Sequence, residues 1–175
     1  MIAVRRVAAA TMLAALAGIS APSAFAAAAA TDDAPFLKAI HQGNLAEIAA
    51  GQDTGKNATT ACVKTVGATL VRDHRRLDAD VKALAGKLHV TLPAGPSPAQ
   101  EQALATVRAK TGTSTYDVAW LNTEATGHVE ALALIDQEMG TGSNAEVEAA
   151  ARAARPVVAR HLELLRDCKA EIDRS

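Results

Sequence analysis

The sequence predicts an all-α protein, a four-helix bundle with a long crossover between its second and third helices that contains a short helix. Four long segments have apolar residues at the three- and four-residue spacing of an amphipathic helix, and no segment has the alternation typical of a strand. Aromatic residues make up only 2% of the chain. The core is therefore expected to be aliphatic and rich in alanine, which suits closely packed helices.

The first 26 residues have the pattern of a secretory signal peptide. Arg5 and Arg6 form a positive start, Val7 to Ile19 form an apolar core, and Ala24-Phe25-Ala26 is a cleavage site of the A-x-A type. The apolar run is shorter than the ~20 residues of a transmembrane helix, and an uncleaved amino-terminal anchor is the alternative. We expect an exported protein of the periplasm or cell envelope, with no membrane span in the mature chain.

Residues 33–173 are expected to form the bundle domain, beginning with two helices joined by a short turn. Capping residues, and a proline in a first turn, mark the starts of these helices. The first helix is predicted from Pro35 to Thr54 with its cap at Asp32 or Asp33, and the second from a cap at Asn57 or Thr59 to about His89.

The positions of proline and glycine define the crossover and the last two long helices. Three prolines and a glycine between Val90 and Pro98 exclude a continuous helix there. A short helix is then predicted from Pro98 to about Lys110, a third long helix from Thr115 to Met139, and a fourth from a cap at Ser143 or Asn144 to Ile172. Pro156 is expected to kink the fourth helix.

Cys62 and Cys168 are the two cysteines of the chain, and a disulfide between them is expected in an exported protein. The crossover returns the chain to the end of the bundle where the second helix begins, which brings both cysteines to that end. Without a crossover they would lie ~40 Å apart, beyond the reach of a disulfide. Two separate buried thiols are the alternative.

Three long helices each carry one histidine at a position where the apolar stripe should continue. These are His74, His128 and His161, and Glu47 lies close to the middle of the apolar face of the first helix. Counted at about 1.5 Å per residue from the shared end, the four side chains lie within ~10 Å of one level. Imidazole and carboxylate groups bind iron, zinc and copper. The sequence therefore predicts a transition-metal site at these four residues.

Three carboxylates are predicted as additional ligands or as acceptors for the imidazole N–H groups: Asp78, Asp117 and Glu124. Glu124 and His128 are four residues apart and share a helix face. The alternative is a metal-free buried network in which carboxylates hydrogen-bond to the histidines. His41 and His89 are expected at the surface.

Several short motifs follow one another in a recognisable order and spacing. They are Pro35-Phe36-Leu37, Gly43-Asn44-Leu45-Ala46-Glu47, Val71-Arg72-Asp73-His74, Tyr116-Asp117 before Trp120-Leu121 and His128, and Pro156-Val157-Val158-Ala159-Arg160-His161-Leu162. With these motifs the chain, from about Asp33 to Ile172, resembles domain-of-unknown-function family four-one-four-two, whose exported bacterial members are often labelled as outer membrane proteins. The resemblance implies a ferritin-like four-helix fold in the periplasm or at the envelope, and it implies no particular activity.

The composition argues against several function classes. Without the two signal arginines the chain has 16 basic and 19 acidic residues, which provides no basic stripe for nucleic acid. No glycine-rich loop is present for a nucleotide. Met139 is the one methionine after the signal peptide, and with so few aromatics this argues against haem. No histidine lies in the Glu-x-x-His motif of di-iron carboxylate proteins.

We therefore expect a bundle that binds a transition metal (iron, zinc or copper) for metal handling or stress protection. The alternative is a non-catalytic envelope or structural protein with a metal-free histidine network. A metal-dependent oxidase is a third interpretation, so catalysis stays undecided at this level.

Overall fold

The computed structural model describes residues 33–174, so the predicted signal peptide lies outside the described part of the chain. Within these residues there are helices and no strand: α1 (Ala34–Asn57), α2 (Ala61–Lys87), α3 (Pro98–Arg108), α4 (Tyr116–Thr141) and α5 (Ala145–Ile172). Each predicted helix is present, and its ends differ from the prediction by three residues or fewer. None of the described helices combines the length and apolarity needed to cross a membrane.

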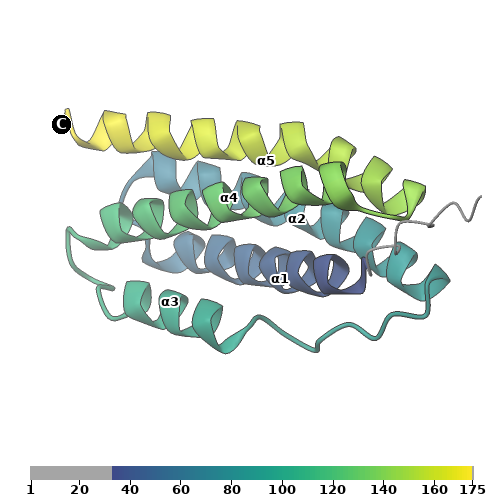
Figure 1. Ribbon diagram of the computed structural model, residues 1–175. Coiled ribbons are helices and arrows are strands. Elements are labelled where there is room, and N and C mark those ends of the chain that lie inside the picture. The colour runs from purple at the N-terminus through teal and green to yellow at the C-terminus, as the bar shows by residue number, and fades with distance from the viewer. Residues whose placement is uncertain (1–32, 175) are drawn as a thin grey trace, which may run out of the picture.

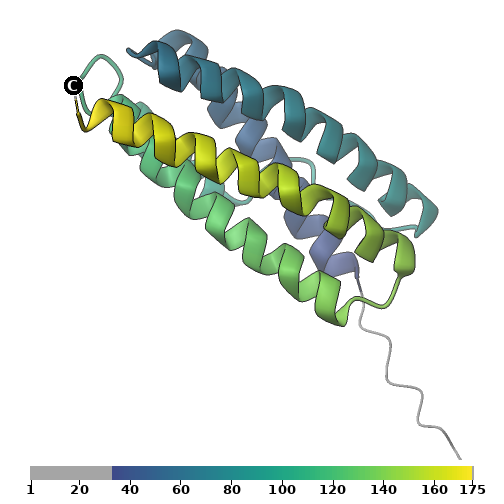
Figure 2. The ribbon, with the colours of Figure 1, turned by 90° about the horizontal axis from the view of Figure 1, so that it is seen from above.

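The four long helices form the bundle, and α3 lies outside it within the crossover (Figure 1). Residues 58–60 join α1 to α2 and residues 142–144 join α4 to α5, so each of these pairs is antiparallel. The crossover runs back along the bundle, and α4 therefore starts at the end where α2 starts. Figure 2 shows α5 between α2 and α4, and α1 packs against the same two helices. The predicted four-helix bundle and its crossover are confirmed.

A disulfide between Cys62 and Cys168 joins the start of α2 to the end of α5. The two Cα atoms lie 5.8 Å apart although the residues are 106 positions apart in the chain. This is the pairing that the crossover topology predicts. It fixes the register of α2 against α5 at one end of the bundle.

A buried aspartate secures each of the two short interhelical turns. At the disulfide end, Asp117 accepts hydrogen bonds from the backbone N–H groups of Thr59 and Thr60, at 2.9 and 2.7 Å. At the opposite end, Asp33 accepts from the backbone N–H groups of Ser143 and Asn144, at 2.9 and 2.8 Å. Each carboxylate thus ties the start of one helix to the turn between two others.

These contacts change two of the predicted helix caps. The cap of α2 is Thr60, whose hydroxyl accepts from the Val63 N–H, because the Thr59 hydroxyl donates to Asp117 instead. Asp33 precedes α1 as predicted, but its side chain makes no capping bond to that helix. Asn144 caps α5, and α5 is continuous through Pro156.

The core consists of two apolar clusters with a polar layer between them. One lies at the disulfide end and contains the fully buried Trp120 and Tyr116. The other lies at the opposite end and contains Leu37 and Val147. On three helices a histidine separates the two clusters: His74 between Leu70 and Val81, His128 between Leu121 and Ile135, and His161 between Val158 and Leu165.

Two glycines allow α1 and α2 to approach closely near this layer. A Cβ atom on Gly67 would lie 2.1 Å from the Thr54 hydroxyl oxygen, and one on Gly51 would lie 2.6 Å from the Gly67 carbonyl oxygen. Neither distance is compatible with a methyl group. Glycine at these two positions therefore allows the backbones of α1 and α2 to come into direct contact.

Candidate metal centre

The three core histidines meet at one level of the bundle, as the residue count from the helix ends predicts. His74, His128 and His161 are 5%, 1% and 1% exposed, and their ring centroids lie 5.1 to 5.7 Å apart. They come from α2, α4 and α5, so no two belong to the same helix. We call these three residues the histidine cluster.

One nitrogen of each ring faces an acceptor that orients the ring. The three contacts are His74 Nδ1 to the Asn44 side-chain oxygen at 2.9 Å, His128 Nδ1 to the Glu124 carbonyl at 2.8 Å, and His161 Nε2 to the Asp73 carboxylate at 3.0 Å. Because oxygen acceptors require a donor, each of these nitrogens carries the hydrogen. The opposite nitrogen of a neutral ring then presents a lone pair, which is how protein ligands to metals are usually oriented.

The remaining nitrogens are buried and have no hydrogen-bond partner among the described residues. They are Nε2 of His74, Nε2 of His128 and Nδ1 of His161. A nitrogen of each ring lies within 4.8 Å of a nitrogen of each other ring. Three unpaired buried acceptors would be costly in a purely structural layer, because each forfeits its hydration.

Burial also keeps the three rings neutral. Loss of hydration, with repulsion from the other two rings, lowers the pKa of His74 to about 3. Burial lowers the pKa of His128 to about 4. The pKa of His161 is lowered by burial too, while the Asp73 carboxylate opposes this effect. Neutral imidazole is the form that binds a metal ion, so no proton has to leave the rings first.

Glu47 and Glu124 lie beside the histidine cluster and interact with each other. Burial, repulsion from Glu124 and a hydrogen bond to it raise the pKa of Glu47 well above its usual value. Burial raises the pKa of Glu124 to about 7. The raised pKa values favour the protonated form of both carboxyl groups compared with an exposed glutamate. With His128 they form a second group of ligand atoms within 4.8 Å of one another.

The sequence predicts Glu47 as a metal ligand with the three histidines, and the structure places its carboxylate on the Nδ1 side of His128. Its Oε1 atom lies 3.6 Å from Nδ1 of His128, the nitrogen that faces the Glu124 carbonyl. The unpaired Nε2 of His128 is on the other side of the ring. Glu47 is therefore next to the cluster without facing the three free nitrogens.

Two carboxylates expected near the histidines lie elsewhere. Asp78 is one helical turn beyond His74 and contacts His41 Nδ1 at 2.6 Å and the Lys82 ammonium at 2.7 Å. Asp117 lies at the start of α4, about three turns before His128, where it secures the turn between α1 and α2. Asp117 is too far along α4 to reach the cluster, and the Asp78 carboxylate is engaged by His41 and Lys82 instead.

The surface position predicted for His41 is wrong. Its side chain is buried because the crossover covers it, and its Nε2 faces the Pro93 carbonyl oxygen at 3.1 Å. Both ring nitrogens of His41 therefore have partners, unlike those of the histidine cluster. His89 is exposed, as predicted.

The sequence prediction missed Asn44 and Asp73, the side chains that orient His74 and His161. Asn44 lies three residues before Glu47 on the same face of α1, and a polar residue at that spacing was a usable signal. Asp73 directly precedes His74 and so points about 100° away from it, toward α5. Only the packing of α2 against α5 identifies that direction.

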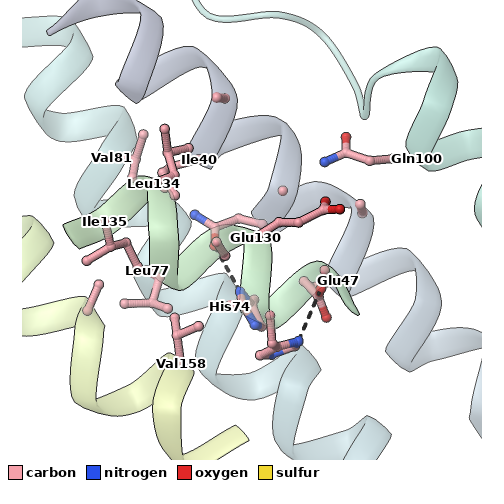
Figure 3. A pocket seen from close by; sticks show the side chains of 18 of the residues that line it. Ile40, Glu47, His74, Leu77, Val81, Gln100, Glu130, Leu134, Ile135 and Val158 are labelled. Atoms are coloured by element: carbon pink, nitrogen blue, oxygen red, sulfur yellow. Dashed lines mark hydrogen bonds and ion pairs between the residues drawn. The ribbon is translucent and has the colours of Figure 1, made fainter. Parts of the chain in front are cut away.

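A cavity of about 1700 Å³ connects the cluster with the surface. His74, His128, Glu47 and Glu124 line it, together with many alanine and aliphatic side chains, and so does the exposed Glu130 (Figure 3). The histidines are therefore buried yet reachable by a small solute.

Comparison with known proteins gives a family and no function. The model of the family described as Domain of unknown function (DUF4142) matches residues 19–167. Searches for similar curated proteins and for similar solved structures each found no significant match.

Proposed function

The chain belongs to the DUF4142 family, whose domain has no assigned function, and we propose on this premise that it binds a single transition-metal ion at His74, His128 and His161. One observation carries the proposal. Each histidine has one nitrogen held by an acceptor and the other unpaired and buried, and the three ring centroids lie 5.1 to 5.7 Å apart. A cation is the partner that three neutral imidazoles at one level of the core would bind together.

The ligand set favours a borderline metal ion. Three imidazoles without a thiolate suit Zn²⁺, Cu²⁺ or Fe²⁺ better than Mg²⁺ or Ca²⁺, which prefer oxygen ligands. Ligands on one tetrahedral ion at about 2.0–2.1 Å are about 3.4 Å apart. The nitrogens lie within 4.8 Å of one another, so small side-chain movements would complete the site. Three protein ligands leave a coordination position for another group, and Glu47 Oε1 lies 3.6 Å from Nδ1 of His128.

The metal-free interpretation predicts a different arrangement. In a closed network the histidines would donate to and accept from one another or from carboxylates, which leaves few lone pairs unpaired. In the described residues the unpaired nitrogens of all three rings have no protein donor. Ordered water is the remaining metal-free partner, and metal analysis separates water from a bound ion.

We propose further that the protein works outside the cytoplasm. A disulfide persists in oxidising compartments, and the Cys62–Cys168 bond therefore suggests an exported protein. The sequence-based signal peptide supports the same location. An intact mass that begins at Ala27 in protein from the periplasm is the expected result, and a mass that includes Met1 would contradict it.

The test of metal binding is elemental analysis of the mature chain purified from the periplasm without chelators or affinity tags. About one equivalent of zinc, copper or iron is expected in the wild type. A His74→Gln, His128→Gln variant should retain less than a tenth of it, since it removes two of three ligands. His89→Gln is the matched control, because that histidine is exposed and outside the cluster. Equal, sub-stoichiometric metal in all three proteins would refute the proposal.

A further inference from the structure

Glu47 and Glu124 line the same cavity as His74 and His128 and lie beside the histidine cluster. Both carboxyl groups line the cavity, and both lie with His128 in one group of candidate ligands. One oxygen of Glu47, Oε2, is buried without a hydrogen-bond partner among the described residues.

Exposure decreases in steps along this side of the cavity. Glu130 is exposed, the Glu47 side chain is 15% exposed, and the His128 side chain is 1% exposed. Figure 3 shows Glu130 and Glu47 on the side of the cavity that faces Gln100 of α3. A cation that enters there meets carboxylate oxygens before it meets imidazole nitrogens.

We propose that Glu47 and Glu124 form a second, transient cation position, through which a divalent transition-metal ion passes from the cavity to the three histidines. The inference rests on the proposed function, since it concerns how that site is filled. Carboxylates accept a partly hydrated ion readily, and negative groups in a cleft raise the local cation concentration and the rate of association. The bond from His128 Nδ1 to the Glu124 carbonyl connects the two positions within one turn of α4.

The opposite side of the cluster is less suited to cation entry. A small hollow there reaches His161, but the guanidinium-bearing residues Arg72 and Arg160 line it. Arg72 also donates to the Asp73 carboxylate, at 2.8 Å. Arg72 is paired with Asp73 and Arg160 with Glu163, so this hollow offers a cation no excess of negative charge. The acidic residues that line the cavity outnumber its arginines, Arg76 and Arg108, so the electrostatics favour the side with Glu47 and Glu130.

The experiment measures how fast metal-free protein takes up Co²⁺, whose visible absorption reports its ligands. Stopped-flow loading is compared in the wild type and in a Glu47→Gln, Glu124→Gln variant. A Glu163→Gln, Glu171→Gln variant is the control, because it makes the same two substitutions at exposed positions of α5. The carboxylate-pair variant should load about tenfold more slowly. Its dissociation rate into excess chelator should fall similarly, so that the equilibrium affinity and the absorption spectrum change little.

A second variant keeps the test independent of core substitutions. Glu130→Gln changes only an exposed residue at the mouth of the cavity, and we expect it to slow loading about twofold to threefold.

Several outcomes would overturn the inference. Loading at the wild-type rate in the carboxylate-pair variant would show that the pair is not on the path. Weaker equilibrium binding with a changed Co²⁺ spectrum would make Glu47 or Glu124 a permanent ligand. Slow loading in Asp73→Asn alone would place the entrance between α2 and α5. Failure of the wild type to bind Co²⁺ at all would instead refute the proposed function, which keeps the two failures distinct.

Discussion

Replacement of His128 by leucine should stabilise the metal-free protein and destabilise the metal-bound protein relative to the wild type. His128 is 1% exposed and lies between Leu121 and Ile135 of the two apolar clusters. Its Nε2 has no partner among the described residues. A side chain that binds an ion destabilises the fold when the ion is absent. The effect of His128→Leu on the free energy of unfolding should therefore change sign when metal is added, which distinguishes a ligand from a structural residue.

The size of the effect follows from the contacts. Leucine forfeits the bond from Nδ1 to the Glu124 carbonyl, which costs about 1 kcal/mol. It also removes an unsatisfied buried nitrogen, worth about 1–3 kcal/mol, and adds apolar contact with both clusters. In a chelator we therefore expect His128→Leu to be more stable by about 2 kcal/mol. At a free metal concentration of about 1,000 times Kd, the wild type gains about 4 kcal/mol, and the variant gains none. The order of stability then reverses.

The assay is urea unfolding with Trp120 fluorescence as the probe, since the chain has one tryptophan and it is fully buried. His41→Leu is the matched comparison. Both nitrogens of His41 have partners, so its loss leaves Asp78 buried without that partner and should cost about 2–3 kcal/mol with or without metal. If His128→Leu behaves like His41→Leu and destabilises the chelated protein, the cluster is structural and the reasoning is wrong.

Three further predictions concern the fold. Gly67→Ala should destabilise the protein by about 1–3 kcal/mol, because the added methyl group would collide with Thr54. Gly43 has open space around it, so Gly43→Ala should stabilise α1 by up to about 1 kcal/mol. Equal urea midpoints for the two variants would contradict this. A Cys62→Ser, Cys168→Ser variant should lose about 2–4 kcal/mol, since the disulfide closes a long loop; an unchanged midpoint would count against the bond. Burial, with repulsion from nearby acidic groups, raises the pKa of Glu138 to about 7. The folded state therefore keeps this proton to higher pH than the unfolded state does, and stability should fall by about 1–2 kcal/mol between about pH 5 and pH 8. Glu138→Gln should remove that part of the slope, and an identical slope in the variant would refute the assignment.

The level of the site could be predicted from the sequence because helices have a fixed rise per residue. The short turns after α1 and α4, together with the cysteine pair, define where each long helix begins and ends. Counting residues from those ends was then sufficient to bring His74, His128 and His161 together. Apolar periodicity also identified the faces on which they lie, so the three histidines needed no information from tertiary contacts.

The partners of the histidines could not be predicted in the same way, because they depend on which helices are neighbours. Asp78 shares a face with His74, but that face continues toward His41 and the crossover, whose Pro93 carbonyl has no periodic signal in the sequence. Asp73 points away from the face of His74 and meets His161 only because α2 packs against α5. Residue counting and apolar periodicity specify the level and the helix face of each histidine. Its hydrogen-bond partners depend on which helices pack against one another.

The hydrogen bonds around the cluster are the reason to propose a metal site in place of a polar layer that only sets the register of the helices. The Cys62–Cys168 disulfide, the turns held by Asp33 and Asp117, and the Gly51–Gly67 contact already fix that register. Three buried imidazoles that break the core in two would add cost without adding specificity. Since each ring is oriented by one acceptor and left with a free nitrogen on its other side, the arrangement has the geometry of a ligand set. The stability cost of the metal-free cluster is then the quantity that metal binding offsets.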